Sequence, residues 1–197
     1  MNNQAILEEQ NIKLPEVKFS EAQTIYKAFK ERASKRNMTE KEFTLQEISN
    51  IMWAACGINR DNGRSTAPLL WEHHLYIANR HGIHKYDAQN NQLNKVLEED
   101  IRAKMAFQDF VQKGPIIIIL AVDTNDMSND WLDRLGGKDF YAANQTSVVS
   151  QNIYLCAAAM DISTVAMTYY DKKFVDDKLG FTEGMHSYII HPIGHGK

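Results

Sequence analysis

The sequence contains few of the residues and segments that mark secreted or membrane proteins. Only two cysteines, Cys56 and Cys156, occur among 197 residues, and they lie far apart and form no C-x-x-C pair. We expect both to be reduced and buried in helices, as is usual in a cytoplasmic protein. The opening decapeptide MNNQAILEEQ has neither a cationic start nor a long apolar run. It therefore predicts neither a secretory signal nor a membrane span.

Motifs that hold nucleotides, and charge patterns that bind nucleic acids, are also missing. The chain has no glycine-rich dinucleotide fingerprint and no P-loop. Its formal net charge is -3, whereas a nucleic-acid surface needs an excess of lysine and arginine over a whole face. We therefore expect no nucleic-acid partner and no membrane partner.

The seven histidines raise the question of a metal site, but their spacing argues against one. His73 and His74 are adjacent in a segment predicted to be extended, so they point to opposite faces. His191 and His195 are four residues apart, but the proline and glycine between them prevent the helix that would align them. Since no acidic residue or cysteine completes a ligand set, we predict no metal site.

A short basic segment, Lys30 to Arg36 (KERASKR), contains four cations in this slightly acidic chain. In an extended backbone alternate side chains point the same way, so Arg32, Ser34 and Arg36 would converge on one anion. Guanidinium groups match phosphate oxygens, and a hydroxyl adds a further hydrogen bond. The segment therefore favours a small phosphate-bearing ligand; the alternative is a solvated basic turn.

Hydrophobic spacing and capping residues predict a soluble α+β domain around this segment, and 44% hydrophobic residues are enough for a core. Residues 1–18 are interpreted as an N-terminal arm, and residues 123–138 as a loop that covers an active site. The buried, β-branched run Pro115 to Val122 predicts a central strand. The expected helices are 20–31, 44–56, 98–111, 140–160 and 172–179. The other expected strands are 74–78, 83–86, 163–167 and a last strand that starts at 188–190 and runs into 191–197, with a hairpin turn between 86 and 93.

Three strings, in order along the chain, resemble the FMN-dependent nitroreductase family. Residues 32–36 (RASKR) are similar to its Arg-Arg-Ser-x-Arg motif, residues 53–60 (WAACGINR) to its Trp-Ala-Ala-x-Gly-Ile-Asn-Arg string, and residues 150–155 (SQNIYL) to its Ser-Gln-Asn-x-Tyr-Leu string. The resemblance extends over about residues 20–197. It implies a nitroreductase-like mixed central sheet flanked by helices, one FMN-binding domain over residues 19–197, and an intertwined homodimer.

The resemblance also implies where FMN would bind. The basic segment would hold the flavin phosphate, the loop after residue 60 would approach the ring edge, and the backbone after strand 163–167 would offer an N–H group to N5 of the flavin. The implied cofactor-binding residues are Arg32, Ala33, Ser34, Arg36, Pro68, Leu69, Leu70, Val165, Ala166 and Lys197. This chain departs from the family at Glu72 and at residues 145–147, where relatives carry Asn and Asp-x-Gly respectively.

The implied activity is ping-pong transfer of reducing equivalents from NAD(P)H, through FMN, to a small-molecule acceptor of the nitro or quinone type. Because the flavin carries the chemistry, no side chain is assigned as a catalytic acid or base. Tyr169 and Tyr170 are either neighbours of the flavin ring or residues of the core. Two alternatives remain: a flavin dehydrogenase that acts on a peptide or small metabolite, and a flavin-binding or anion-binding protein without turnover.

Overall fold

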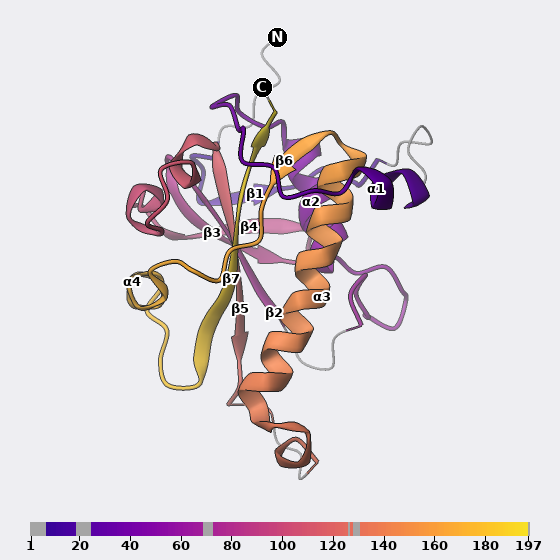
Figure 1. Ribbon diagram of the computed structural model, residues 1–197, viewed down its shortest axis with the longest axis vertical. Coiled ribbons are helices and arrows are strands. Elements are labelled where there is room, and N and C mark those ends of the chain that lie inside the picture. The colour runs from indigo at the N-terminus through magenta and orange to yellow at the C-terminus, as the bar shows by residue number, and fades with distance from the viewer. Residues whose placement is uncertain (1–6, 19–24, 69–72, 126, 128–130, 197) are drawn as a thin grey trace.

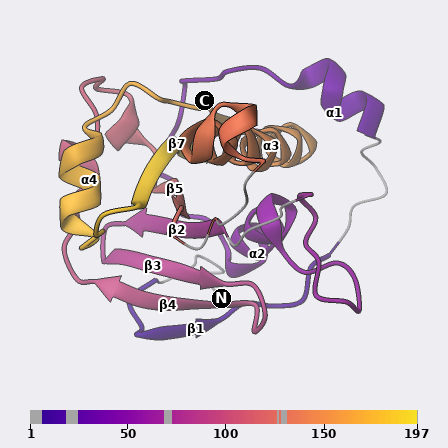
Figure 2. The same cartoon turned by 90° about the horizontal axis from the view of Figure 1, so that it is seen from below.

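The computed structural model describes residues 7–18, 25–68, 73–125, 127 and 131–196. These residues form one sheet of seven strands with helices on both faces (Figures 1 and 2). The strands are β1 (Asn11–Lys13), β2 (His73–Asn79), β3 (Gly82–Asp87), β4 (Gln92–Leu97), β5 (Ile116–Asp123), β6 (Ile162–Thr164) and β7 (Met185–His195). The helices are α1 (Ile25–Glu31), α2 (Leu45–Cys56), α3 (Gly137–Ala159) and α4 (Lys172–Lys178), and the 3-10 turns are η1 (Arg102–Lys104), η2 (Val111–Lys113) and η3 (Asp133–Leu135).

The strand order is β1-β4-β3-β2-β5-β7-β6. The predicted α+β class is confirmed, but each described pairing is antiparallel, where a mixed sheet was expected. The physical reason lies in the connections: β2, β3 and β4 follow one another through tight turns, which reverse the chain and impose antiparallel pairing. The predicted hairpin over residues 86–93 is one of these turns.

The predicted central strand is confirmed as β5, which is buried on both faces. Ile116, Ile118 and Leu120 pack with residues of α2 and α3. The alternating residues Ile117, Ile119 and Ala121 pack on the opposite face, with residues of α4 and of the segment from 101 to 111. A strand covered on both sides needs apolar residues at successive positions, which is why its sequence shows no alternation.

The predicted capping box at the start of α2 is also confirmed. The Thr44 hydroxyl accepts a hydrogen bond from the Glu47 N–H at 3.1 Å, and the Glu47 carboxylate accepts one from the Thr44 N–H at 2.7 Å. The helix ends at Cys56, directly before Gly57, as expected. The cap therefore fixes the position from which α2 presents Ile48 and Ile51 to the sheet.

The predicted helix over residues 98–111 is wrong: the segment contains only the 3-10 turns η1 and η2. The Asp100 carboxylate accepts a hydrogen bond from the Arg102 N–H at 3.1 Å, and the Arg102 guanidinium donates to the carbonyls of Gly114 and Pro115 at 3.1 and 2.8 Å. These contacts fold the segment back onto the start of β5. Ile101 and Met105 are nevertheless buried, so the apolar pattern was real but belongs to a non-helical segment.

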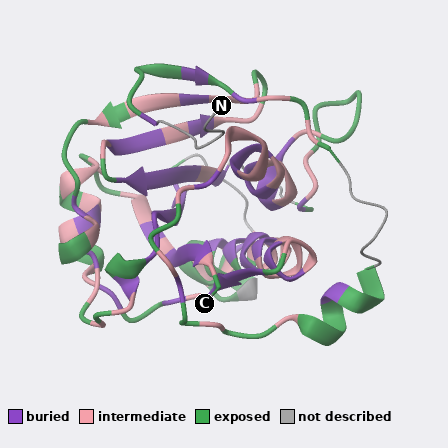
Figure 3. Ribbon diagram, turned by 90° about the horizontal axis from the view of Figure 1, so that it is seen from above, coloured by how far each residue is buried: buried purple, intermediate pink, exposed green. Residues whose placement is uncertain are grey.

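The other helices agree with the sequence more closely. Helix α1 is described from Ile25, so the capping box predicted at residues 20–23 lies outside the described residues. Helix α3 begins at Gly137, three residues before the predicted start at 140, and α4 ends before Gly180, whose φ is 67°. Most of α1 is exposed (Figure 3), including three large apolar side chains on one face: Ile25, Tyr26 and Phe29.

The remaining strands include one that the sequence did not indicate. Residues 11–13, within the predicted arm, form the edge strand β1, and Leu7, Ile12 and Leu14 are buried in the core. Strand β6 covers only part of the predicted segment 163–167, and Met167 makes a single bridge to Ile190 of β7. Strand β7 begins earlier than expected, at Met185, and runs through His191 and Pro192 as predicted.

Candidate functional site

The basic segment runs from the end of α1 along the outer edge of β6. The Lys35 N–H donates to the Thr164 carbonyl at 2.9 Å, and the Thr39 N–H donates to the His195 carbonyl at 2.8 Å. Backbone hydrogen bonds thus hold the segment against the ends of β6 and β7. The side chains of Arg32 and Ser34 consequently sit on a fixed part of the sheet edge, close to α3.

Tyr154 of α3 joins two parts of the predicted site that are distant in sequence. Its hydroxyl lies 2.8 Å from the Ser34 hydroxyl and accepts a hydrogen bond from the Ala166 N–H, also at 2.8 Å. The Arg32 guanidinium carbon lies 5.2 Å from the centre of the Tyr154 ring, a cation–π arrangement. We call Arg32, Ser34, Tyr154 and Ala166 the Tyr154 cluster. Sequence reasoning missed Tyr154 as a site residue, although it belongs to the SQNIYL string.

The other cations of the basic segment point to different partners. The Arg36 guanidinium carbon lies 5.7 Å from the centre of the Phe110 ring, and the Lys35 ammonium lies 3.5 Å from the Asp161 carboxylate. The structure therefore brings Arg32 and Ser34 together at Tyr154, but it places the Arg36 side chain at a different aromatic ring.

A buried histidine, His191, packs against the Tyr154 ring. The Tyr154 and His191 rings pack at a steep angle, with their planes 77° apart and their centres 5.3 Å apart. Nε2 of His191 lies 2.8 Å from the Ser150 hydroxyl, and Nδ1 lies 3.2 Å from the Thr164 hydroxyl. Because Thr164 donates its only hydroxyl proton to the Pro192 carbonyl at 3.1 Å, its oxygen accepts from Nδ1–H, and Nε2 accepts from Ser150.

His191 is neutral in this network. It is fully buried, and burial lowers its pKa to about 3. Burial removes the hydration that stabilises the charged form of the ring. Its hydrogen-bond partners in the described part of the chain, Ser150 and Thr164, are hydroxyls and not carboxylates that could replace that hydration. A neutral, doubly hydrogen-bonded ring is a rigid support for the aromatic ring that packs against it.

The remaining predicted cofactor contacts have varied positions. Ala33 and Pro68 are exposed, whereas Val165, which directly follows β6 in the sequence, is buried. Leu69, Leu70 and Lys197, together with Glu72, lie outside the described residues. Residues 145–147, where the chain departs from the family pattern, lie inside α3, and the Ser147 hydroxyl donates to the Ala143 carbonyl at 2.8 Å.

The two tyrosines considered as ring neighbours differ in burial. Tyr170 is buried, and its hydroxyl donates to the Ser187 hydroxyl at 2.8 Å, so it belongs to the core. Tyr169 is 69% exposed and pairs with Phe107, which is 61% exposed, at 5.2 Å between ring centres. The Asp171 N–H donates to the Met105 carbonyl at 2.9 Å and so ties the two segments together.

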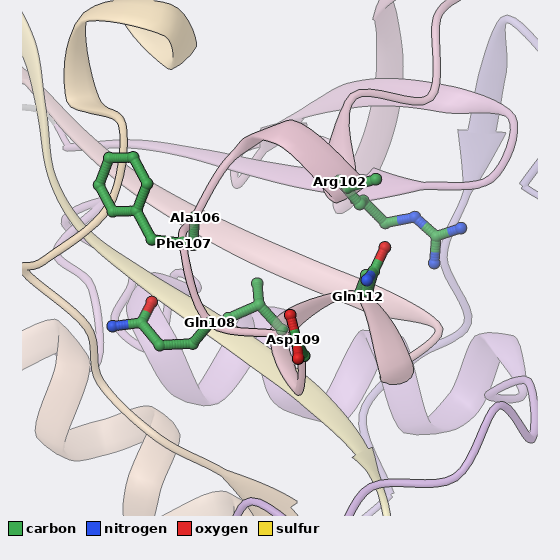
Figure 4. Close-up of a pocket in the computed structure, with 8 residues that line it drawn as sticks. Arg102, Ala106, Phe107, Gln108, Asp109 and Gln112 are labelled. Carbon is green, nitrogen blue, oxygen red and sulfur yellow. The ribbon is translucent and has the colours of Figure 1, made fainter.

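A shallow pocket lies beside this exposed aromatic pair. Figure 4 shows Phe107 and Gln108 on one side of it and Arg102 on the other. Its space of about 40 Å³ has room for a water molecule or two but not for a flavin ring.

The described part of the chain includes no group of three or more histidine, cysteine, aspartate or glutamate side chains placed to hold a metal ion. It also includes no helix that is both long and apolar enough to cross a bilayer.

Comparison with known proteins identifies relatives along most of the chain. The sequence profile described as "Nitroreductase family" matches residues 29–195. A candidate nitroreductase of Methanocaldococcus jannaschii is 27% identical over 156 residues, which cover 72% of this chain and 77% of that protein.

Two solved structures share the fold. A candidate nitroreductase from Ralstonia eutropha JMP134 superimposes with a TM-score of 0.87 at 22% identity, covering 99% of this chain and 93% of that chain. A chain of the E. coli microcin synthetase McbBCD complex, solved with truncated pro-MccB17 bound, superimposes with a TM-score of 0.74 at 13% identity, covering 100% of this chain and 79% of that chain. At these identities the likeness shows a common fold.

Proposed function

The chain belongs to the nitroreductase family, and from that premise we propose that it is an FMN-dependent oxidoreductase. The proposed reaction takes reducing equivalents from NAD(P)H and passes them to a small acceptor of the nitro or quinone type. Bound FMN would supply the hydride chemistry, and the protein's residues would bind and orient it.

The Tyr154 cluster is the observation that carries this proposal. It combines a permanent cation, a hydroxyl and a backbone N–H within a few ångströms of one tyrosine oxygen and its ring. Guanidinium and hydroxyl groups suit a phosphate, because both donate hydrogen bonds to anionic oxygens. Arg32 and Ser34 would hold the phosphate, and the backbone of Val165 and Ala166 would lie along the flavin.

We propose that the active form is a homodimer in cytoplasm. Ile25, Tyr26 and Phe29 form an apolar face on α1, and their exposed fractions are 54%, 83% and 55%. Positions separated by three and four residues lie on one side of a helix, so these side chains form a continuous patch. A second copy that covers α1 would remove this patch from water, and Phe29→Glu should therefore shift the protein towards the monomer in light-scattering measurements.

Oxidation of a peptide or small metabolite by a flavin dehydrogenase is the second candidate function. The observation that favours it is the fold likeness to the microcin synthetase chain, which extends over the whole of this chain. A flavin-binding or anion-binding protein without turnover is the third. Anaerobic addition of NADH or NADPH separates them: a reductase loses its flavin colour, whereas a protein without turnover keeps it, and a dehydrogenase loses it with its own substrate instead.

The direct test is a titration of the purified protein with FMN, followed by the same titration of three variants. Arg32→Ala should weaken binding by about 1.5 to 3 kcal/mol, the contribution of a hydrogen bond to a charged group. Arg36→Ala should have a smaller effect, because that guanidinium lies over Phe110, outside the Tyr154 cluster. Lys173→Ala is the control: it removes an equal charge from α4, where Lys173 pairs with Asp177. Equal affinities for the wild type and Arg32→Ala would place the phosphate elsewhere.

A further inference from the structure

One hydrogen bond of the Tyr154 cluster has a direction that its chemistry determines. The Ala166 N–H can only donate, so the Tyr154 oxygen accepts its hydrogen bond at 2.8 Å. Tyr154 has a single hydroxyl proton. Within the described residues its other hydrogen-bond partner is the Ser34 hydroxyl, at 2.8 Å.

The single Tyr154 proton is thus available to the Ser34 oxygen, 2.8 Å away, and in the arrangement that uses it Tyr154 donates to Ser34. An oxygen that accepts in this way keeps its own proton free to donate, and Ser34 is exposed. The chain of donors runs from Ala166 through Tyr154 to Ser34 and then outward. Each bond in such a chain polarises the next one and strengthens its donor. The last hydroxyl in this series of hydrogen bonds, that of Ser34, is thus an oriented donor near the Arg32 guanidinium. A site made of a donor and a cation suits an anionic ligand and does not suit a donor group.

We infer that Tyr154 is a positioning residue that directs the Ser34 hydroxyl towards a phosphate and so selects phosphorylated over unphosphorylated flavin. This inference rests on the proposed function. His191 contributes by packing against the Tyr154 ring, with 5.3 Å between the ring centres, and Ser150 and Thr164 in turn hold His191. The ring cannot shift without disturbing this buried network.

A purely structural role for Tyr154 makes a different prediction. If the ring only filled space between α3 and β7, loss of its hydroxyl would affect all flavins alike. If Tyr154 orients Ser34, removal of its hydroxyl should weaken binding only of the flavin that carries a phosphate. Riboflavin lacks the phosphate and provides the comparison.

The experiment compares FMN and riboflavin affinities by flavin fluorescence titration in the wild type and Tyr154→Phe. We expect Tyr154→Phe to weaken FMN about threefold to tenfold, the equivalent of one ordinary hydrogen bond, and to leave riboflavin nearly unchanged. Tyr188→Phe, which removes the hydroxyl that donates to Asp139 at 3.0 Å, is the control and should leave the FMN-to-riboflavin ratio at the wild-type value.

A double-mutant cycle with Ser34→Ala adds a second readout. Because Tyr154 acts through Ser34, Tyr154→Phe should cost almost no further FMN affinity once the serine hydroxyl is absent. Additive losses, or equal weakening of FMN and riboflavin, would overturn the inference while leaving the proposed function intact. A wild-type protein that binds neither flavin would overturn the proposed function and this inference with it.

Discussion

Acidification should destabilise the protein through its buried histidines, and His191 should be the main contributor. Burial lowers its folded pKa to about 3, whereas an unfolded histidine titrates near pH 6.5. Between these two pH values the unfolded chain binds a proton at this histidine and the folded chain does not. The free energy of unfolding therefore falls as the pH falls through this window.

The size of the effect follows from one proton. Each pH unit below about 6.5 lowers the stability by about 1.4 kcal/mol per histidine, so a change to about pH 5 removes about 2 kcal/mol through His191. His84 acts in the same direction, because burial lowers its pKa too. The carboxyl groups with lowered pKa values, such as Asp100, contribute only under more acidic conditions.

Urea unfolding at a series of pH values measures this dependence. His191→Gln should be less stable at neutral pH. Its free energy of unfolding should also fall less steeply on acidification, with a slope smaller by about 1.4 kcal/mol per pH unit, the contribution of one proton. Ile190→Val is the control, because it shortens a fully buried neighbour on the same strand and removes no titrating group. A slope in His191→Gln equal to that of the wild type would refute the assignment of a buried neutral imidazole.

Three further predictions follow from single residues. Thr44→Ala removes the cap of α2 and should cost about 1 kcal/mol in urea unfolding; no loss would show that Glu47 caps the helix alone. Gly184→Ala should destabilise by about 1 kcal/mol or more, because the residue has a φ of 88° and a new Cβ would lie 2.3 Å from Asn125 Oδ1; a neutral result would contradict that geometry. Tyr169→Ala should raise KM for nitro or quinone acceptors without changing FMN affinity, since the exposed ring pairs with Phe107 outside the Tyr154 cluster; a matching loss of FMN affinity would place the ring at the cofactor instead.

Local features of the sequence predicted the elements that depend on local physics. The run of apolar, β-branched residues could only be a doubly covered strand, and β5 is one. The Thr44 capping box predicted the start of α2, because both hydrogen bonds lie within four residues of chain. The basic segment was found for the same reason: its charge is visible without knowledge of the fold.

Long-range contacts decided the features that sequence reasoning missed. Tyr154 meets Ser34 across 120 residues, and no periodicity in α3 reveals that contact. Strand β1 forms only because β4 offers it a partner, so its three residues have no strong pattern of their own. The segment after β4 has helical spacing, but the hydrogen bonds of Arg102 to the carbonyls before β5 draw it into short turns.

A crystal structure of the protein with FMN bound would locate the phosphate. We expect phosphate oxygens within hydrogen-bond distance of the Arg32 guanidinium and the Ser34 hydroxyl, with the flavin extending past Ala166. A phosphate bound on another surface, with Arg32 still stacked on Tyr154 and no ligand beside it, would show that this site does not hold the cofactor.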